Sequence, residues 1–202
     1  KVFNLFSDKG ITYSAVIFPA FMFLLTVIVF FLLMSKIFED NKYRYIIAII
    51  ATAFLIVSPS LLARTVAGIP EKESAGFFFL FLSFYLFLSA WKVKSIKKSI
   101  IIAAFAGFST AAMNLIWGGV IYVYISIAIA AFLAFIFNKV ERKEIYVYSI
   151  WIILSTFIVP LVSNRFSFVG MLVSHSSGLG YAVFILLLAD FIIFKTKIKD
   201  MK

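Results

Sequence analysis

Two glutamates that stand two positions apart, preceded by an arginine, are the residues of this chain best suited to chemistry. Arg64, Glu71 and Glu73 belong to the stretch LLARTVAGIPEKESAGFF, which separates two long apolar stretches. Carboxylates are natural ligands of hard divalent cations such as Mg²⁺ and Mn²⁺. On a regular helix, side chains two positions apart point away from each other, so both acids face one ion only where the backbone is extended or turns. Gly68 and Pro70 favour such a turn.

A second interpretation of the same residues needs no ligand. Pro70 suits the first turn of a helix, and Glu71 and Glu73 would be stabilised there by the positive end of the helix dipole. Arg64 could extend its charged end from an apolar helix toward water. The pattern of two glutamates separated by one residue is common in surface loops, so spacing alone leaves both interpretations open.

The composition indicates a membrane protein. Hydrophobic residues make up 64% of the chain, charged residues 14%, and the mean hydropathy is +1.10. Soluble domains are about half apolar and about one quarter charged. Cysteine is absent, which excludes disulfides, thiolate metal sites and a cysteine nucleophile within these 202 residues.

Long stretches without charge predict the membrane-spanning helices, because a helix needs about 20 apolar residues to cross the hydrocarbon core. The stretch 100–138 is 39 residues long, which as one helix would measure about 58 Å. Gly118 and Gly119, beside Trp117, predict a turn within it. We therefore expect an all-α polytopic transmembrane helix bundle, a single domain over residues 1–202. Its predicted spans, about seven, cover residues 11–35, 45–63, 74–91, 100–116, 120–138, 145–163 and 177–194.

The basic residues predict the orientation, because they concentrate in short cytoplasmic loops. An N-terminus outside the cell membrane places 14 of the 19 basic residues on the cytoplasmic side and the loop of Glu71 on the external face. The net charge of +10 then reflects topology and lipid contact rather than nucleic-acid binding. The residues on the cytoplasmic side are Lys36, Lys42, Arg44, Lys92, Lys94, Lys97, Lys98, Lys139, Arg142, Lys143, Lys195, Lys197, Lys199 and Lys202.

The stretch RTVAGIPEKE resembles the second external-loop motif of the catalytic subunit of oligosaccharyltransferases, especially of the archaeal type. This family moves a lipid-linked glycan onto asparagine. Its motif has an arginine, a threonine or serine, a glycine and two acids separated by one residue. The preceding SPSLLAR and the later NLIWGG also resemble family sequences, which places this chain at about the second to eighth spans of a longer protein. The matching positions here are Arg64, Thr65, Gly68, Glu71 and Glu73.

The resemblance implies the fold of the membrane domain shared by polyprenyl-phosphate-sugar-dependent glycosyltransferases. It makes Glu71 a ligand of the catalytic Mg²⁺ or Mn²⁺, Glu73 the second acid at the metal, and Arg64 a cation that orders the loop or meets the donor phosphate. The implied substrates are a lipid-linked oligosaccharide and an acceptor polypeptide with an asparagine sequon.

The chain departs from the family pattern in several respects. The family more often has aspartate at the position of Glu71. Its first external acidic motif, its later external-loop glutamate and its C-terminal Trp-Trp-Asp-Tyr-Gly sequence do not occur in these 202 residues. Asp8 follows the expected position of the first acidic motif and receives no role. We therefore expect this part of the chain to be inactive by itself.

The sequence leaves two alternatives to an oligosaccharyltransferase open. The first is another polyprenyl-phosphosugar glycosyltransferase, which typically keeps its acids in the first external loop. The second is a transporter or a structural membrane subunit, for which only Asn114, Asp190 and the Ser58-Pro59-Ser60 segment offer polar material within the spans. His175 and Arg165 are interpreted as solvated or headgroup-facing residues, Asp190 as a carboxylate that reaches the cytoplasmic interface, and Asn114 as a packing residue.

Overall fold

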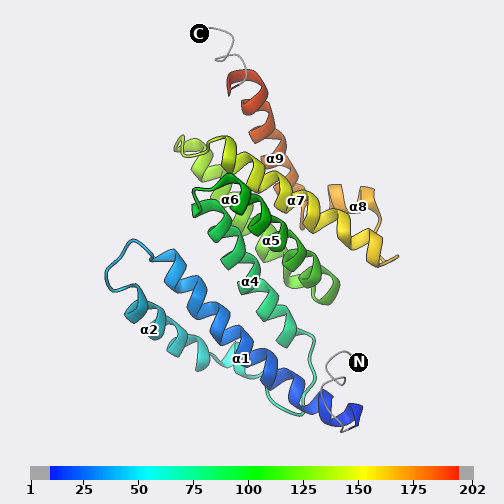
Figure 1. Cartoon of the computed structure of the whole chain (residues 1–202). Helices are drawn as coiled ribbons and strands as arrows, with labels where there is room; N and C mark the ends of the chain where they lie inside the picture. The colour runs from blue at the N-terminus through cyan, green and yellow to red at the C-terminus, as the bar shows by residue number, and fades with distance from the viewer. Residues whose placement is uncertain (1–9, 196–202) are drawn as a thin grey trace. The chain divides into compact units, whose positions relative to one another are not determined.

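The computed structural model describes residues 10–195, and within this range every regular element is a helix (Figure 1). This confirms the predicted all-α, polytopic helical bundle. The elements are α1 (Ile11–Ile37), α2 (Arg44–Ile56), α3 (Pro59–Leu62), α4 (Glu73–Lys92), α5 (Ile96–Ile116), η2 (Gly118–Val120), α6 (Ile121–Ile136), α7 (Arg142–Val162), α8 (Phe168–Val173), α9 (Gly178–Asp190) and η3 (Phe191–Lys195).

Five helical segments of the described chain are long and apolar enough to cross a membrane: α1, α4, α5, η2 with α6, and α7. The predicted second span, residues 45–63, is divided into α2 and α3. Pro59 has no N–H to donate and occupies the first position of α3. The preceding Ser58 is extended, with φ −67° and ψ 119°, because a residue before proline avoids the helical region.

The turn expected at Trp117 is present. Helix α5 ends at Ile116, and Trp117 adopts an extended backbone with φ −147° and ψ 133° before Gly118 begins the short helix η2. The 39-residue charge-free stretch is therefore folded back as two helices.

The chain divides into two compact units, residues 1–85 and residues 86–202. In the described part of the first unit, α1 and α2 form a helical hairpin (Figure 1). Phe31 of α1 stacks on Tyr45 of α2, with ring centroids 6.5 Å apart. Phe30 of α1 makes an edge contact with Phe81 of α4, at 4.9 Å between centroids. The single domain expected over residues 1–202 stays a prediction.

The second unit is built around the contact between α5 and α7. A Cβ atom added to Gly107 of α5 would lie 2.8 Å from the Cβ of Leu154 and 3.2 Å from the carbonyl oxygen of Trp151. Only glycine therefore permits this approach of the two helices, as is typical of helix pairs in membranes. The small side chains around it let the backbones pack closely.

Hydrogen bonds between helices of this unit satisfy several of its buried polar groups. The indole Nε1 of Trp151 donates to the hydroxyl of Thr110 at 3.0 Å, and the hydroxyl of Tyr124 on α6 donates to the carbonyl of Ser155 at 3.0 Å. Asn114, also buried, donates to the sulfur of Met171 at 3.9 Å. Hydrocarbon offers no partners for such groups, so these bonds stabilise one particular helix arrangement.

Candidate functional site

The loop between α3 and α4 carries the predicted site, and its backbone turns tightly. Gly68 has φ +94°, a conformation that glycine adopts without strain. Its N–H donates to the carbonyl of Val16 on α1 at 2.9 Å, which fixes the middle of the loop to a helix. The N–H of Glu71 then donates to the carbonyl of Ile69 at 2.8 Å. The turn that the two acids required is therefore present.

Two buried hydroxyls anchor the ends of the loop. Thr65 is 6% exposed and donates to the carbonyl of Leu61 at 2.9 Å. Ser74 is fully buried and donates to the carbonyl of Glu71 at 2.8 Å, so it holds the backbone of the acid most important to the prediction. The role of Ser74 was not predicted from the sequence. Its signal was a serine near the start of a helix, where its hydroxyl often bonds a nearby backbone group.

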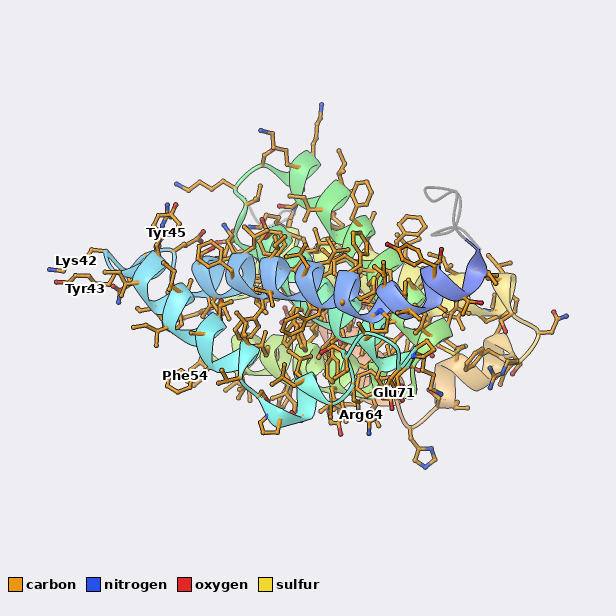
Figure 2. The ribbon with its side chains drawn as sticks, turned by 90° about the horizontal axis from the view of Figure 1, so that it is seen from below. Lys42, Tyr43, Tyr45, Phe54, Arg64 and Glu71 are labelled. Carbon is orange, nitrogen blue, oxygen red and sulfur yellow. The ribbon has the colours of Figure 1, made fainter. Side chains whose placement is uncertain are left out.

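Arg64 and Glu71 lie together (Figure 2), and Glu73 is also close to Arg64. One guanidinium nitrogen of Arg64, Nη1, is 3.0 Å from a carboxylate oxygen of Glu71 and 3.8 Å from a carboxylate oxygen of Glu73. The exposed fractions of the three side chains are 49%, 35% and 16%. Two carboxylates thus face one positively charged point; Glu71 is about one-third exposed, whereas most of the Glu73 side chain is covered.

The helix-dipole interpretation accounts for only part of this arrangement. Glu73 is the first residue of α4, where the positive end of the helix favours its charge. Glu71 and Pro70 both precede the helix, so the dipole interpretation does not explain why the carboxylate of Glu71 turns toward Arg64. An ion pair this exposed contributes about 0–1 kcal/mol to stability. The ion pair between Arg64 and Glu71 therefore adds little to the stability of the protein, so a ligand could replace it at a small cost in free energy.

The two acids fit a divalent cation as part of its ligand set. They supply oxygen, the ligand that Mg²⁺ and Mn²⁺ prefer, whereas Mg²⁺ takes about six ligands, several of them commonly water. Among residues 10–195, no group of three or more His, Cys, Asp or Glu side chains is placed to hold a metal ion. The other oxygens would come from water, from substrate phosphate or from residues beyond those described, and Asp8 lies outside the described residues.

Three further polar residues, His175, Arg165 and Asp190, belong to the second unit. His175 is exposed in the link between α8 and α9, and Arg165 is exposed in the link between α7 and α8. Asp190 is the last residue of α9 and is partly buried. The structure brings none of these three together within one loop.

Substituting Gly68 with alanine is expected to loosen the loop. An alanine at φ +94° is strained by about 1–2 kcal/mol, and relieving that strain would weaken the hydrogen bond to Val16. Amide hydrogen exchange of residues 64–73 should accelerate about tenfold. Gly178→Ala is the matched control, since an added Cβ there meets nothing within 4 Å. Equal exchange in the two variants would contradict a role for the Gly68 conformation in holding the loop.

Comparison with known proteins identifies the family. Residues 1–201 match the family described as "Oligosaccharyl transferase STT3, N-terminal". The chain belongs to the oligosaccharyl transferase STT3 family. A relative in Saccharomyces cerevisiae, the dolichyl-diphosphooligosaccharide–protein glycosyltransferase subunit STT3, is 26% identical over 129 residues. That match covers 64% of this chain and 17% of the yeast protein. The predicted membership of the oligosaccharyltransferase family is confirmed.

STT3 is a glycosyltransferase family, which argues against the transporter and structural-subunit alternatives. The described apolar helices agree with a multi-pass membrane domain of an STT3 protein. The loop of Arg64, Glu71 and Glu73 lies inside the matched range. The match covers only a small fraction of the yeast protein. The activity of a whole STT3 protein that contains this domain is therefore proposed below.

Proposed function

We propose that this chain is the membrane part of an oligosaccharyltransferase that transfers a glycan from a polyprenyl-phosphate-linked donor to the asparagine of an acceptor sequon. The reaction depends on Mg²⁺ or Mn²⁺ and takes place at the external membrane face. The observation that carries this proposal is the convergence of Glu71 and Glu73 on one point beside Arg64, within a chain of the STT3 family. The printed name of the yeast relative, a dolichyl-diphosphooligosaccharide–protein glycosyltransferase subunit, supports a donor of this kind.

The chain's own residues have distinct roles in this proposal. Glu71 and Glu73 hold the cation, with Glu71 positioned by Ser74 and by the turn at Gly68. A bound divalent cation supplies positive charge that orients the acceptor and stabilises the charge developing on the leaving group. Arg64, half exposed, would bind a donor phosphate, a group that its planar donors bind well.

The position of the loop suits a lipid-linked donor. It follows the apolar segments α2 and α3 and precedes the membrane-spanning helix α4, so its charged groups lie near one membrane surface. A polyprenyl tail would remain in hydrocarbon while the phosphate reaches the loop. The external face is proposed because the opposite assignment would place most basic residues outside, against the usual distribution.

A transfer assay on the full-length protein tests this function. The membrane-reconstituted protein receives a polyprenyl-pyrophosphate-linked oligosaccharide and a fluorescent peptide with an asparagine sequon. Chelation of divalent cations is expected to reduce transfer at least about a hundredfold, and added Mn²⁺ or Mg²⁺ should restore it. Full transfer after chelation would contradict the metal dependence. Release of the glycan without attachment to asparagine would contradict the proposed acceptor.

A further inference from the structure

The turn between α1 and α2 presents two cations on two tyrosine rings. The guanidinium carbon of Arg44 lies 4.3 Å from the ring centroid of Tyr45, and the amine of Lys42 lies 4.7 Å from the centroid of Tyr43. Both tyrosines are about half exposed, at 53% for Tyr43 and 52% for Tyr45. Figure 2 shows this cluster at the opposite end of α2 from Arg64 and Glu71.

An apolar groove runs along the same hairpin. It lies between α1 and α2 and has a volume of about 400 Å³. Thr52 is the polar residue of its lining, and its hydroxyl donates to the carbonyl of Ala48 at 2.7 Å, so the lining offers a hydrocarbon surface. The lining residues are Val27, Ile28, Phe31, Ile49, Thr52, Ala53 and Ile56.

The cation cluster and the groove are continuous. Phe31 lines the groove and also stacks on Tyr45, whose ring carries Arg44. From Tyr45 to Ile56 the helix rises about 16 Å at about 1.5 Å per residue. One leaflet provides about 15 Å of hydrocarbon, half of the bilayer core. The lining residues of α2, from Ile49 to Ile56, cover about 10 Å of that rise. The charged end is therefore followed by an apolar groove about two-thirds as deep as one leaflet, which suits part of an acyl chain.

We propose that the α1–α2 hairpin binds a phospholipid with an anionic headgroup. The phosphate lies against Arg44 and Lys42, and one acyl chain occupies the groove. The charge of the turn favours an anionic headgroup, because Glu39 is ion-paired with Lys36 and the two cations exceed the remaining acid, Asp40. This inference is independent of the proposed glycan transfer.

The size of the groove favours a lipid over a protein segment. An α-helix with side chains is about 10–12 Å across and rises about 5.4 Å per turn, so two turns of helix need about twice the volume of this groove, which is about 400 Å³. That volume instead falls in the range of small-molecule sites, about 300–1,000 Å³. An acyl chain is narrow, and it is the apolar ligand present wherever a membrane protein meets its bilayer.

Native mass spectrometry of the full-length protein tests the headgroup contact. The protein is reconstituted in phosphatidylcholine with and without phosphatidylglycerol, and the lipids retained on release are counted. Phosphatidylglycerol should be retained in preference, and the double variant Lys42→Gln with Arg44→Gln should bind it about fivefold more weakly for each charge removed. Lys94→Gln with Lys97→Gln is the matched control and should retain it, because it removes two exposed lysines elsewhere, one in the link between α4 and α5 and one in the first turn of α5.

Two further variants test the groove. Ala53→Phe adds volume inside it and should displace the lipid, whereas Ile50→Phe adds an aromatic ring on the same helix outside the lining residues and should not. A photoreactive benzoylphenylalanine at Ile49 should form an adduct with phosphatidylglycerol. Equal retention of the two lipids, unchanged binding by the double variant, or an adduct between position 49 and another polypeptide segment would each overturn the proposal. Arg44→Lys retains the charge and should retain the lipid.

Discussion

Replacement of Glu71 by glutamine is expected to reduce glycan transfer by the full-length protein at least about a hundredfold. The amide keeps the shape of the side chain and its reach toward Arg64 but removes the negative charge that a divalent cation requires. Loss of the exposed ion pair should cost at most about 1 kcal/mol of stability. The initial rate of peptide glycosylation, measured over a series of Mn²⁺ concentrations, is the readout.

Two other variants of the same loop separate charge from structure. Glu71→Asp keeps the charge on a shorter side chain, so transfer should be retained, with a change mainly in the Mn²⁺ concentration needed. Lys72→Gln alters an exposed neighbour that makes no contact in the Arg64 cluster and should leave transfer unchanged. Unchanged glycosylation by Glu71→Gln at low Mn²⁺ would rule out the ligand role. An equal loss in Lys72→Gln would show a general effect of loop charge.

The helices could be predicted from the sequence because hydropathy identifies the segments that are long and apolar enough to cross a membrane. A stretch such as residues 11–35 has no stable alternative to a helix in hydrocarbon, since every backbone group must be bonded within it. The turn at Trp117 could also be predicted, because a stretch of 39 uncharged residues is longer than one membrane-spanning helix needs. The division of residues 45–63 at Ser58 and Pro59 was not predicted. It depended on one backbone conformation that hydropathy does not record.

Helix pairing could not be predicted in the same way. In α5 and α7 apolar residues occur on all sides, so no apolar stripe indicates which face meets a neighbour. The decisive features are single residues: Gly107, which permits close approach, and the bond from Trp151 to Thr110. Such features become recognisable only after the partner helix is known.

The sequence indicated candidate residues for the site and only part of their geometry. Gly68 indicated a turn, and the structure has one. The sequence did not indicate that Arg64, seven residues from Glu71, pairs with it, because a loop of that length can close in many ways. The contact of Gly68 with Val16 depends on α1, which is far away in the sequence.

The largest expected loss of stability in the second unit follows from replacing Trp151 with alanine. This side chain is fully buried on α7 and contacts Phe87 at 5.3 Å, Tyr148 at 5.3 Å and Tyr124 at 5.7 Å between ring centroids. Truncation removes these contacts, leaves a cavity and abolishes the bond to Thr110. A buried tryptophan reduced to alanine typically costs about 3–5 kcal/mol. The free energy of unfolding in mixed micelles, measured for the full-length protein, should fall by about this amount.

Most of that loss should come from packing rather than from the hydrogen bond. Bonds between membrane helices contribute on average about 0.6 kcal/mol, so Thr110→Val, which removes only the bonding partner, should cost far less than Trp151→Ala. Phe105→Ala on α5 controls for loss of an aromatic ring, because Phe105 is 60% exposed and should give little change. If Phe105→Ala destabilised the protein as much as Trp151→Ala, the contact between α5 and α7 would not be the structural centre of this unit. A Thr110→Val loss equal to that of Trp151→Ala would instead assign the stability to the hydrogen bond.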